Sequence, residues 1–403
     1  MTLRLSDNVR ELRPSATLAV AARARELAAA GADIVDLSAG EPDFDTPAFA
    51  ADAGVQAIRD GKTRYTAAAG LPELRRAIAR ELGRASGIET DPAGVVVTAG
   101  AKQALFNAMF VLFGEGDRVI VPAPYWTSYP ALAHLARAEP VFVHGDPALG
   151  FKVTPRILDD ADVGGCAGIV LNSPSNPTGA VYDERELRAI AEWAAARGMW
   201  LIGDQIYNRL YYEGARAPGL LDLGPEIAAR AVVIDGASKL FAMTGWRIGF
   251  SYSSAPLASA MASVQSHMTS NATTPSQYAA LAAYSEDPAT RDEVRVMQHA
   301  FRARRDLVVR LFRDLLPGVD FVEPAGAFYL FFRVDSFYDD TMRDSVALCA
   351  RLLDDAGVAL VPGEAFGDDR YVRMSYATSE AAIEDGIGRI ARVLDRSSVV
   401  GSR

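Results

Sequence analysis

Residues 236–249 read Gly-Ala-Ser-Lys-Leu-Phe-Ala-Met-Thr-Gly-Trp-Arg-Ile-Gly, and they follow the apolar, β-type run Ala231–Asp235. Of the 41 lysines and arginines in the chain only four are lysines, so Lys239 is a rare primary amine. An amine can lose its proton and form a Schiff base with a carbonyl, which a guanidinium cannot do. Arg247 offers a fixed guanidinium that is suited to a phosphate. Together the two residues indicate pyridoxal phosphate (PLP) as a cofactor, although a Ser-Lys pair alone also fits a solvated loop.

Composition narrows the class of protein. The 403 residues are half hydrophobic, enough for two domains or one large α/β domain with an appendage. A net charge of −10 and a pI near 5.1 argue against nucleic acid or an anionic membrane as the main partner.

The cysteines and the N-terminus bear on location. Cys166 and Cys349 lie far apart in apolar surroundings, so we expect buried free thiols and a reducing compartment. Four scattered histidines and two cysteines give no metal-ligand spacing, so no metal site is expected. No apolar leader or run of membrane length is present, and we expect a cytoplasmic protein.

The central region alternates apolar β-type runs with helical patterns. Such alternation is typical of a mostly parallel sheet that is covered on both faces. Ligands of such sheets bind at the carboxyl ends of the strands, where the unusual residues of this chain cluster. The predicted strands are Val95–Thr98, Arg118–Val121, Pro140–Val143, Ile169–Leu171, Met199–Ile202, Val232–Ile234 and Ile248–Tyr252, with helices over residues 102–113, 128–137 and 184–197.

The pattern changes near the C-terminal third. A long helical pattern over about residues 288–316 ends at Pro317-Gly318. Beyond it lie hairpin-like strands, Phe328–Phe332 and Tyr371–Tyr376, with helices near 342–356 and 379–394. We therefore expect a smaller α+β domain over residues 291–403 and a large domain over 47–290. Residues 1–46 are expected to form an N-terminal arm and part of the small domain.

Several residues at predicted strand ends have side chains suited to a cofactor. Gly100-Ala101-Lys102 lies between a strand and a helix, where backbone N–H groups can approach a phosphate. Asp204 ends a strand, where a carboxylate can keep a cationic ring nitrogen protonated; a helix cap is the alternative. Tyr207 could bond a ring oxygen, or pack as an ordinary aromatic residue.

Three further features fit the same site. Residues 172–179 read Asn-Ser-Pro-Ser-Asn-Pro-Thr-Gly, and the two prolines would hold Asn176 rigidly at a strand end. Trp126 follows another strand and could stack on a flat ring, with core packing as the alternative. Arg373 is a charged residue inside an apolar strand, so it requires an anionic partner. A substrate α-carboxylate and a structural salt bridge both meet that requirement.

With these motifs in place, the chain resembles the class I, fold-type I PLP-dependent aminotransferases, and in particular the bacterial aspartate aminotransferase subgroup. The likeness covers nearly the whole chain. It implies a ping-pong transfer of an amino group between an L-amino acid and a 2-oxo acid. It rests on Arg13–Thr17, Ala39–Pro47, Tyr65 with Gly70-Leu-Pro, Asn172–Gly179 and Ser238–Gly249.

The resemblance implies roles by position. Lys239 would be the Schiff-base lysine and proton shuttle, Asp204 the partner of the ring nitrogen, and Tyr207 a donor to the ring oxygen. Tyr65 would reach the phosphate of a neighbouring subunit, which implies a homodimer with shared sites. The implied cofactor-binding set is Gly100, Ala101, Lys102, Trp126, Asn176, Asp204, Tyr207, Ser238, Lys239, Arg247 and Tyr65. The implied substrate-binding set is Gly40, Trp126, Asn176, Arg373, Arg13, Ser15, Thr17 and Lys102.

The substrate follows less directly. The subgroup meets acidic side chains with a lysine at the position of Lys102 and with hydroxyls at those of Ser15 and Thr17, so aspartate or glutamate is the leading donor. Prephenate and aromatic 2-oxo acids remain open. The chain has Gln205 where the family commonly has a glutamate, and strand alternation places its side chain away from the site.

Other functions share this scaffold. A β-lyase or an amino acid oxidase would keep Lys239, Asp204 and Arg373 but would need no paired 2-oxo acid. A PLP-binding sensor would need a DNA-binding module, for which residues 1–30 leave no room.

Overall fold

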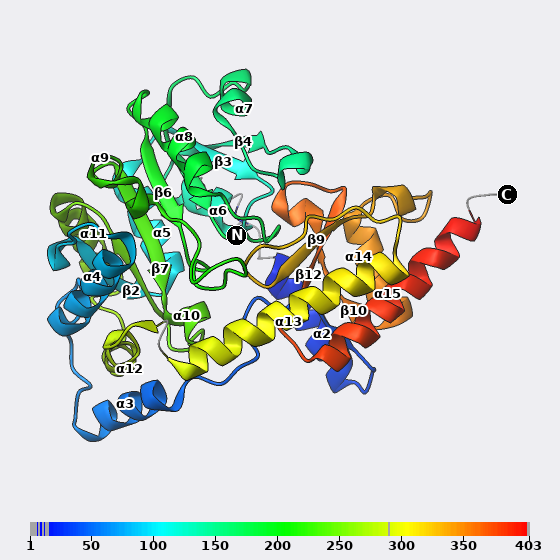
Figure 1. Cartoon of the computed structure of the whole chain (residues 1–403), viewed down its shortest axis with the longest axis horizontal. Coiled ribbons are helices and arrows are strands. Elements are labelled where there is room, and N and C mark those ends of the chain that lie inside the picture. The colour runs from blue at the N-terminus through cyan, green and yellow to red at the C-terminus, as the bar shows by residue number, and fades with distance from the viewer. Residues whose placement is uncertain (1–5, 7–8, 10–11, 13–15, 289–290, 401–403) are drawn as a thin grey trace, which may run out of the picture.

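The computed structural model describes residues 6, 9, 12, 16–288 and 291–400. Figure 1 shows a large sheet flanked by helices and a smaller body that contains both the N-terminal helix and the C-terminal helices. The long helix α13 (Asp292–Leu315) runs between the two bodies. The proposed domain limits at residues 46 and 290 stay a prediction.

The large sheet has seven strands in the order β2-β8-β7-β6-β5-β3-β4. Its pairs β3–β4, β3–β5, β5–β6 and β6–β7 are parallel, and only β8 pairs antiparallel with its neighbours β2 and β7. This confirms the predicted mostly parallel sheet. The strands are β2 (Val95–Ala99), β3 (Arg118–Ala123), β4 (Glu139–His144), β5 (Cys166–Asn172), β6 (Trp200–Asp204), β7 (Ala231–Gly236) and β8 (Ile248–Tyr252).

Both faces of this sheet are covered. Along β2, Val96 packs into one hydrophobic cluster and Val95 and Val97 into another, because successive side chains point to opposite faces. On β6, Leu201 and Ile202 likewise pack into two different clusters, one on each face of the sheet. The larger helices of this body are α3 (Ala48–Arg59), α4 (Pro72–Ser86), α5 (Ala101–Leu112), α6 (Ser128–Leu135), α8 (Glu184–Ala195), α11 (Ala255–Met268) and α12 (Thr274–Tyr284); α7 (Pro155–Asp160), α9 (Pro225–Ala228) and α10 (Ala237–Leu240) are short.

The smaller body is built on a three-stranded antiparallel sheet, β11-β12-β9. Its strands are β9 (Tyr329–Arg333), β11 (Val361–Pro362) and β12 (Tyr371–Ser375), packed with α13, α14 (Ser345–Ala356) and α15 (Glu380–Val400). β9 and β12 pair as predicted, with Arg373 opposite Phe331, but residues 334–370 lie between them. The helix predicted near 342–356 lies in this connection as α14.

The N-terminal segment joins the smaller body through a short parallel pair, β1 (Val35–Asp36) with β10 (Val358–Ala359). Helix α2 (Ala16–Ala29) precedes it. Residues 37–41 then run from the smaller body toward the large one, and Leu37 donates its N–H to Ala359 O (3.0 Å). This path brings a short N-terminal segment alongside the ends of the large sheet.

The two cysteines, Cys166 and Cys349, are buried and unbonded to each other, as expected. Among the described residues, no helix is long and apolar enough to span a membrane, and no cluster of His, Cys, Asp or Glu is arranged to hold a metal ion.

The core of the smaller body contains a group of aromatic rings. Phe301 of α13 is fully buried. Its ring stacks on the Phe328 ring, with the centroids 5.3 Å apart, and meets the Phe44 ring edge-on, with the centroids 5.5 Å apart. Phe44 comes from the N-terminal segment and Phe328 precedes β9, so one side chain ties three distant segments together.

We predict that Phe301→Ala lowers the free energy of unfolding by about 3–5 kcal/mol, because it leaves a cavity among these rings. Val296→Ala on the same helix is the control, since Val296 is 62% exposed, and should change the free energy by no more than about 0.5 kcal/mol. Urea denaturation of both variants measures the difference. Equal losses would contradict this account of the core.

Candidate active site

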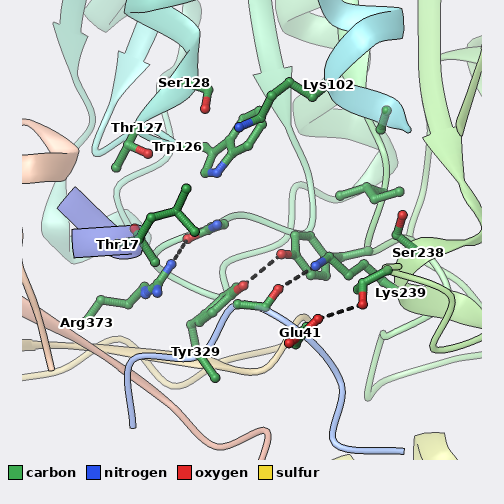
Figure 2. A pocket seen from close by; sticks show the side chains of 18 of the residues that line it. Thr17, Glu41, Lys102, Trp126, Thr127, Ser128, Ser238, Lys239, Tyr329 and Arg373 are labelled. Atoms are coloured by element: carbon green, nitrogen blue, oxygen red, sulfur yellow. Dashed lines mark hydrogen bonds between the residues drawn. The ribbon is translucent and has the colours of Figure 1, made fainter. Parts of the chain in front are cut away.

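A pocket of about 440 Å³ opens where the carboxyl ends of β5, β6 and β7 face the smaller body. Figure 2 shows its lining side chains, with Lys239 and Arg373 on opposite sides and Trp126 and Lys102 above them. Parallel strands place these side chains together because their carboxyl ends share one edge of the sheet.

Lys239 lies on α10, directly after β7. Its Nζ donates a hydrogen bond to the Gly40 carbonyl and lies 5.8 Å from the centroids of the Tyr207 and Phe328 rings. Burial lowers the pKa of this amine to about 8, aided by the charges of Arg247 and Arg373 and opposed by Glu41 and Asp204. At pH 7 about a tenth of the amine is then uncharged, far more than for a lysine with its ordinary pKa, and the uncharged form is what a nucleophile or general base requires.

Asp204 ends β6 and is 4% exposed. Its Oδ2 accepts a hydrogen bond from the Tyr129 hydroxyl at 2.7 Å, and its Oδ1 accepts the Ile206 N–H at 3.3 Å. Burial raises the pKa of the carboxyl to about 6, although both hydrogen bonds and the charge of Lys239 oppose that rise. A buried amine and a buried carboxyl, shifted toward neutral pH from opposite sides, are typical of a catalytic site.

Arg373 is 1% exposed in the middle of β12. Its Nη1 donates to Asn176 Oδ1 at 3.0 Å and its Nη2 to the Ser38 carbonyl at 2.8 Å, while its Nε has no partner among the described residues. No carboxylate of the described residues lies within ion-pair distance of the Arg373 guanidinium. The guanidinium also lies over the Tyr329 and Phe366 rings, at 4.4 and 5.0 Å from their centroids. A buried cation held by neutral oxygens and aromatic rings, without an ion pair among the described residues, favours a bound anion over a structural salt bridge.

The segment 172–179 is anchored to β6. Asn172 donates through Nδ2 to the Asp204 carbonyl at 3.1 Å, and its Oδ1 accepts the Asn176 N–H at 2.8 Å. The Asn176 side chain thus points at Arg373 from a turn that is itself bonded to the strand bearing Asp204.

A tight cradle lies at the start of α5. Gly100 has φ +80°, and a Cβ there would lie 2.3 Å from the Arg247 guanidinium. Gly249 is equally close, since its Cβ would meet the Ala101 nitrogen at 2.2 Å. Only glycine fits at both positions, and the first N–H groups of α5 have no acceptor within the helix. Arg247, Ser238 and Ala101 line this end of the pocket, a set of donors suited to a phosphate.

Lys102 and Trp126 lie together on the wall of the pocket that is drawn above Arg373 in Figure 2. The Lys102 Nζ lies 5.0 Å from the centroid of the Trp126 ring. Burial lowers the pKa of Lys102, and the charge of Arg247 adds to the effect. Thr127 and Ser128 lie near Trp126, whereas Thr17 of α2 lies beside Arg373 (Figure 2).

Most residues predicted for the site line this one pocket, but not all do. Gly100 lies beside it, against Arg247. Tyr65 is 87% exposed and is not among the lining residues, and Arg13 and Ser15 lie outside the described residues. Gln205 is also absent from the lining, and its amide packs against Gly219. The predicted residues that do line the pocket are Thr17, Gly40, Ala101, Lys102, Trp126, Asn176, Asp204, Tyr207, Ser238, Lys239, Arg247 and Arg373.

Sequence patterns missed several lining residues, among them Glu41, Tyr129 and Tyr329, which make hydrogen bonds in the pocket. Glu41 accepts a hydrogen bond from the Thr244 hydroxyl at 2.6 Å, and Tyr329 shares a 2.8 Å hydrogen bond with Tyr207. Tyr129 bonds to Asp204. Glu41 lies within the conspicuous run Ala39–Pro47 and could have been found, whereas the two tyrosines look like ordinary core residues.

A family model and individual relatives place this chain in the same protein family. Residues 32–390 match the family model "Aminotransferase class I and II". The aspartate aminotransferase of Geobacillus stearothermophilus is 42% identical over 402 residues, which span 98% of this chain and 99% of that protein. The aspartate/prephenate aminotransferase of Thermus thermophilus is 42% identical over 394 residues, spanning 98% and 99%.

Solved structures agree. The aspartate aminotransferase of Thermus thermophilus with maleate superposes with a TM-score of 0.91 at 41% identity, covering 97% of this chain and all of that one (100%). The aspartate aminotransferase of Rhizobium meliloti also gives 0.91, at 38% identity, with 98% and 100% covered. This likeness over nearly the whole chain confirms the predicted fold.

The lowered pKa of Lys239 predicts a pH-dependent stability in the ligand-free protein. An unfolded chain keeps this amine charged up to about its ordinary pKa of 10.5, the folded chain only up to about 8. The buried charge therefore costs stability below pH 8, and the cost fades as the pH rises from about 8 to 10.5. We expect Lys239→Met to be more stable than the parent at pH 7 and to lose that advantage across this window.

Urea denaturation at a series of pH values measures the effect. Lys62→Met, at an exposed position, should show no such pH-dependent gap. A difference between Lys239→Met and the parent that stays constant from pH 7 to pH 10.5 would contradict the inferred desolvation.

Proposed function

The chain belongs to the class I and II aminotransferase family, and we propose that it transfers the amino group of an acidic L-amino acid, aspartate or glutamate, to a 2-oxo acid with pyridoxal 5′-phosphate as its cofactor. Its standing as a transaminase follows from the family match and from relatives about 40% identical over nearly the full chain. One observation carries the finer proposal. A buried amine, Lys239, and a buried carboxyl, Asp204, share a pocket with Arg373, a buried guanidinium without a carboxylate partner.

The residues present fit the cofactor. The cradle of Gly100, Ser238 and Arg247 supplies N–H, hydroxyl and guanidinium donors for its phosphate, and the missing side chain at Gly100 leaves room for close approach. Lys239 would hold its aldehyde carbon and Asp204 its ring nitrogen. When bound, the cofactor supplies an electron-withdrawing pyridinium ring conjugated to the reacting carbon.

The chain's own residues perform the remaining tasks. Because its pKa lies near 8, Lys239 can take a proton from the substrate Cα and return one during transfer. Asp204, held as a carboxylate, keeps the ring nitrogen protonated. Tyr207, hydrogen-bonded to Tyr329, presents its hydroxyl toward the same space. These are proposed roles, supported by the placement of the side chains in one pocket.

Arg373 would bind the substrate α-carboxylate. Its guanidinium is already oriented by Asn176 and by the Ser38 carbonyl, so little conformational freedom is lost on binding. Its buried Nε without a partner leaves donor capacity for an anion. This arrangement fixes the end of the substrate that all L-amino acids share.

An acidic side chain is favoured at the pocket wall that carries Lys102 and Trp126. Lys102 places a partly desolvated cation over Trp126, and Thr127 and Ser128 add hydroxyls near that ring. A carboxylate would restore favourable electrostatics to that amine. The relative solved with maleate, itself a dicarboxylate, supports this substrate class.

We also propose a cytoplasmic homodimer with shared sites. The exposed Tyr65 is free to reach a second copy, and α3, six residues earlier in the chain, exposes Val55 (43%) and Ile58 (57%). Apolar side chains exposed along one segment are typical of a contact surface. Two buried free thiols are consistent with a reducing compartment.

The proposed function is tested by a half-reaction. Protein loaded with pyridoxal phosphate is mixed with single amino acids in the absence of any 2-oxo acid, and absorbance follows the cofactor. We expect stoichiometric conversion from its aldehyde to its amine form, fastest with aspartate or glutamate. Continuous release of ammonia would contradict amino transfer, and no response to dicarboxylic amino acids would contradict the substrate class.

Substrate choice predicts a selective effect of Lys102→Met. We expect kcat/KM for aspartate to fall by about 10- to 100-fold, because a charge-assisted contact to the side-chain carboxylate is lost. The value for alanine, which lacks that carboxylate, should change much less. Lys62→Met controls for net charge. A parallel loss for both amino acids would show that Lys102 serves the cofactor rather than the acidic side chain.

A further inference from the structure

Tyr129 makes a contact that none of the roles above uses. It lies in the first turn of α6, is 2% exposed, and donates its hydroxyl proton to Asp204 Oδ2 at 2.7 Å. The contact joins residues 75 positions apart, on a helix and on a neighbouring strand end. Since both side chains are buried, the hydrogen bond is shielded from competing water.

The geometry makes Tyr129 the main support of that carboxylate. Within the part of the chain that the structure describes, the Asp204 carboxylate accepts one other hydrogen bond, from the Ile206 N–H, and it is longer, at 3.3 Å. Tyr129 is itself held from two sides, because its N–H donates to the Trp126 carbonyl at 3.0 Å and its ring meets the Trp126 ring edge-on at 5.4 Å. One helical turn therefore positions both the ring-stacking residue and the partner of Asp204.

The charges around this contact decide which group donates the hydrogen bond. Burial raises the pKa of Tyr129 well above 10, and the charge of Asp204 adds to the rise. The hydroxyl therefore stays neutral at working pH and acts as a donor. For Asp204, burial is the largest influence on the pKa, and the Tyr129 hydrogen bond is the first of those opposing it. The other titratable groups whose charges couple to Asp204 are Lys239, Tyr207 and Asp235.

We propose that Tyr129 is a positioning residue for the transfer reaction: its hydroxyl keeps Asp204 ionised and aimed, so that the proton shared with the cofactor's ring nitrogen resides on the nitrogen. This inference rests on the proposed function, because it presumes that Asp204 faces that nitrogen. A carboxylate and a ring nitrogen that share one proton compete for it according to their basicities. Removing a donor from the carboxylate makes it more basic and moves the proton toward it.

The test replaces the hydroxyl alone, in holoenzyme reconstituted with pyridoxal phosphate labelled with ¹⁵N in the ring. In the parent we expect the ¹⁵N chemical shift of a protonated ring nitrogen near neutral pH. In Tyr129→Phe the shift should move toward that of the unprotonated ring. Turnover with aspartate should fall at least about tenfold, since a neutral ring withdraws fewer electrons.

Tyr182→Phe is a matched control. Tyr182 is also a buried tyrosine of the large body, but its hydroxyl accepts the Val153 N–H at 3.0 Å and has no contact with Asp204. This variant should lose some stability while the ring nitrogen signal stays unchanged. If Tyr129 were only structural, Tyr129→Phe would behave like Tyr182→Phe, with some stability lost and the ring nitrogen signal unchanged. An unchanged nitrogen signal in Tyr129→Phe therefore overturns the proposal.

A second substitution guards against misfolding of the first. Incorporating 3-fluorotyrosine at position 129 keeps the ring and makes the hydroxyl a stronger donor. Near neutral pH the ring nitrogen signal should then move toward, or stay at, the protonated value, opposite to the change in Tyr129→Phe. A shift in the same direction for both, or in neither, overturns the proposal. If the parent protein binds no cofactor at all, the proposed function fails first, and this inference fails with it.

Discussion

Removal of water from two charged groups is the constraint on which the site depends. Lys239 and Asp204 would be a charged amine and a free carboxylate in water, yet burial lowers the pKa of one to about 8 and raises that of the other to about 6. Both groups can therefore exchange protons near neutral pH. Arg373 is likewise a buried charge: its guanidinium is held by neutral oxygens and by the Tyr329 and Phe366 rings, with no carboxylate at ion-pair distance among the described residues.

The fold provides this environment by joining two bodies around one sheet edge. Strands β5, β6 and β7 deliver Asn172, Asp204 and the segment leading to Lys239 in adjacent register. The smaller body contributes Arg373 from β12, and the N-terminal segment closes the gap with the Gly40 carbonyl. A pocket assembled from distant parts of the chain excludes water from charges that no single element could bury.

Much of this arrangement was predictable from sequence, for physical reasons. Continuous apolar strands alternating with helices are typical of a covered parallel sheet, and glycine at position 100 marks a close approach of backbone and guanidinium. The sequence also predicts the two strands β9 and β12 with a helix between them, and the structure has them paired antiparallel across that helix. Tyr129 was missed because its significance lies in a contact with Asp204, 75 positions away, which no local pattern records.

We propose that Lys239, and no other amine of the chain, holds the cofactor. The chain offers a sharp test, because its only lysines are Lys62, Lys102, Lys152 and Lys239. Holoenzyme is treated with borohydride to fix the cofactor to the amine that it bonds, then digested and mapped by mass spectrometry. The account predicts the label on the peptide containing Lys239 alone. Label on Lys102, the other pocket lysine, or none on Lys239, would contradict it.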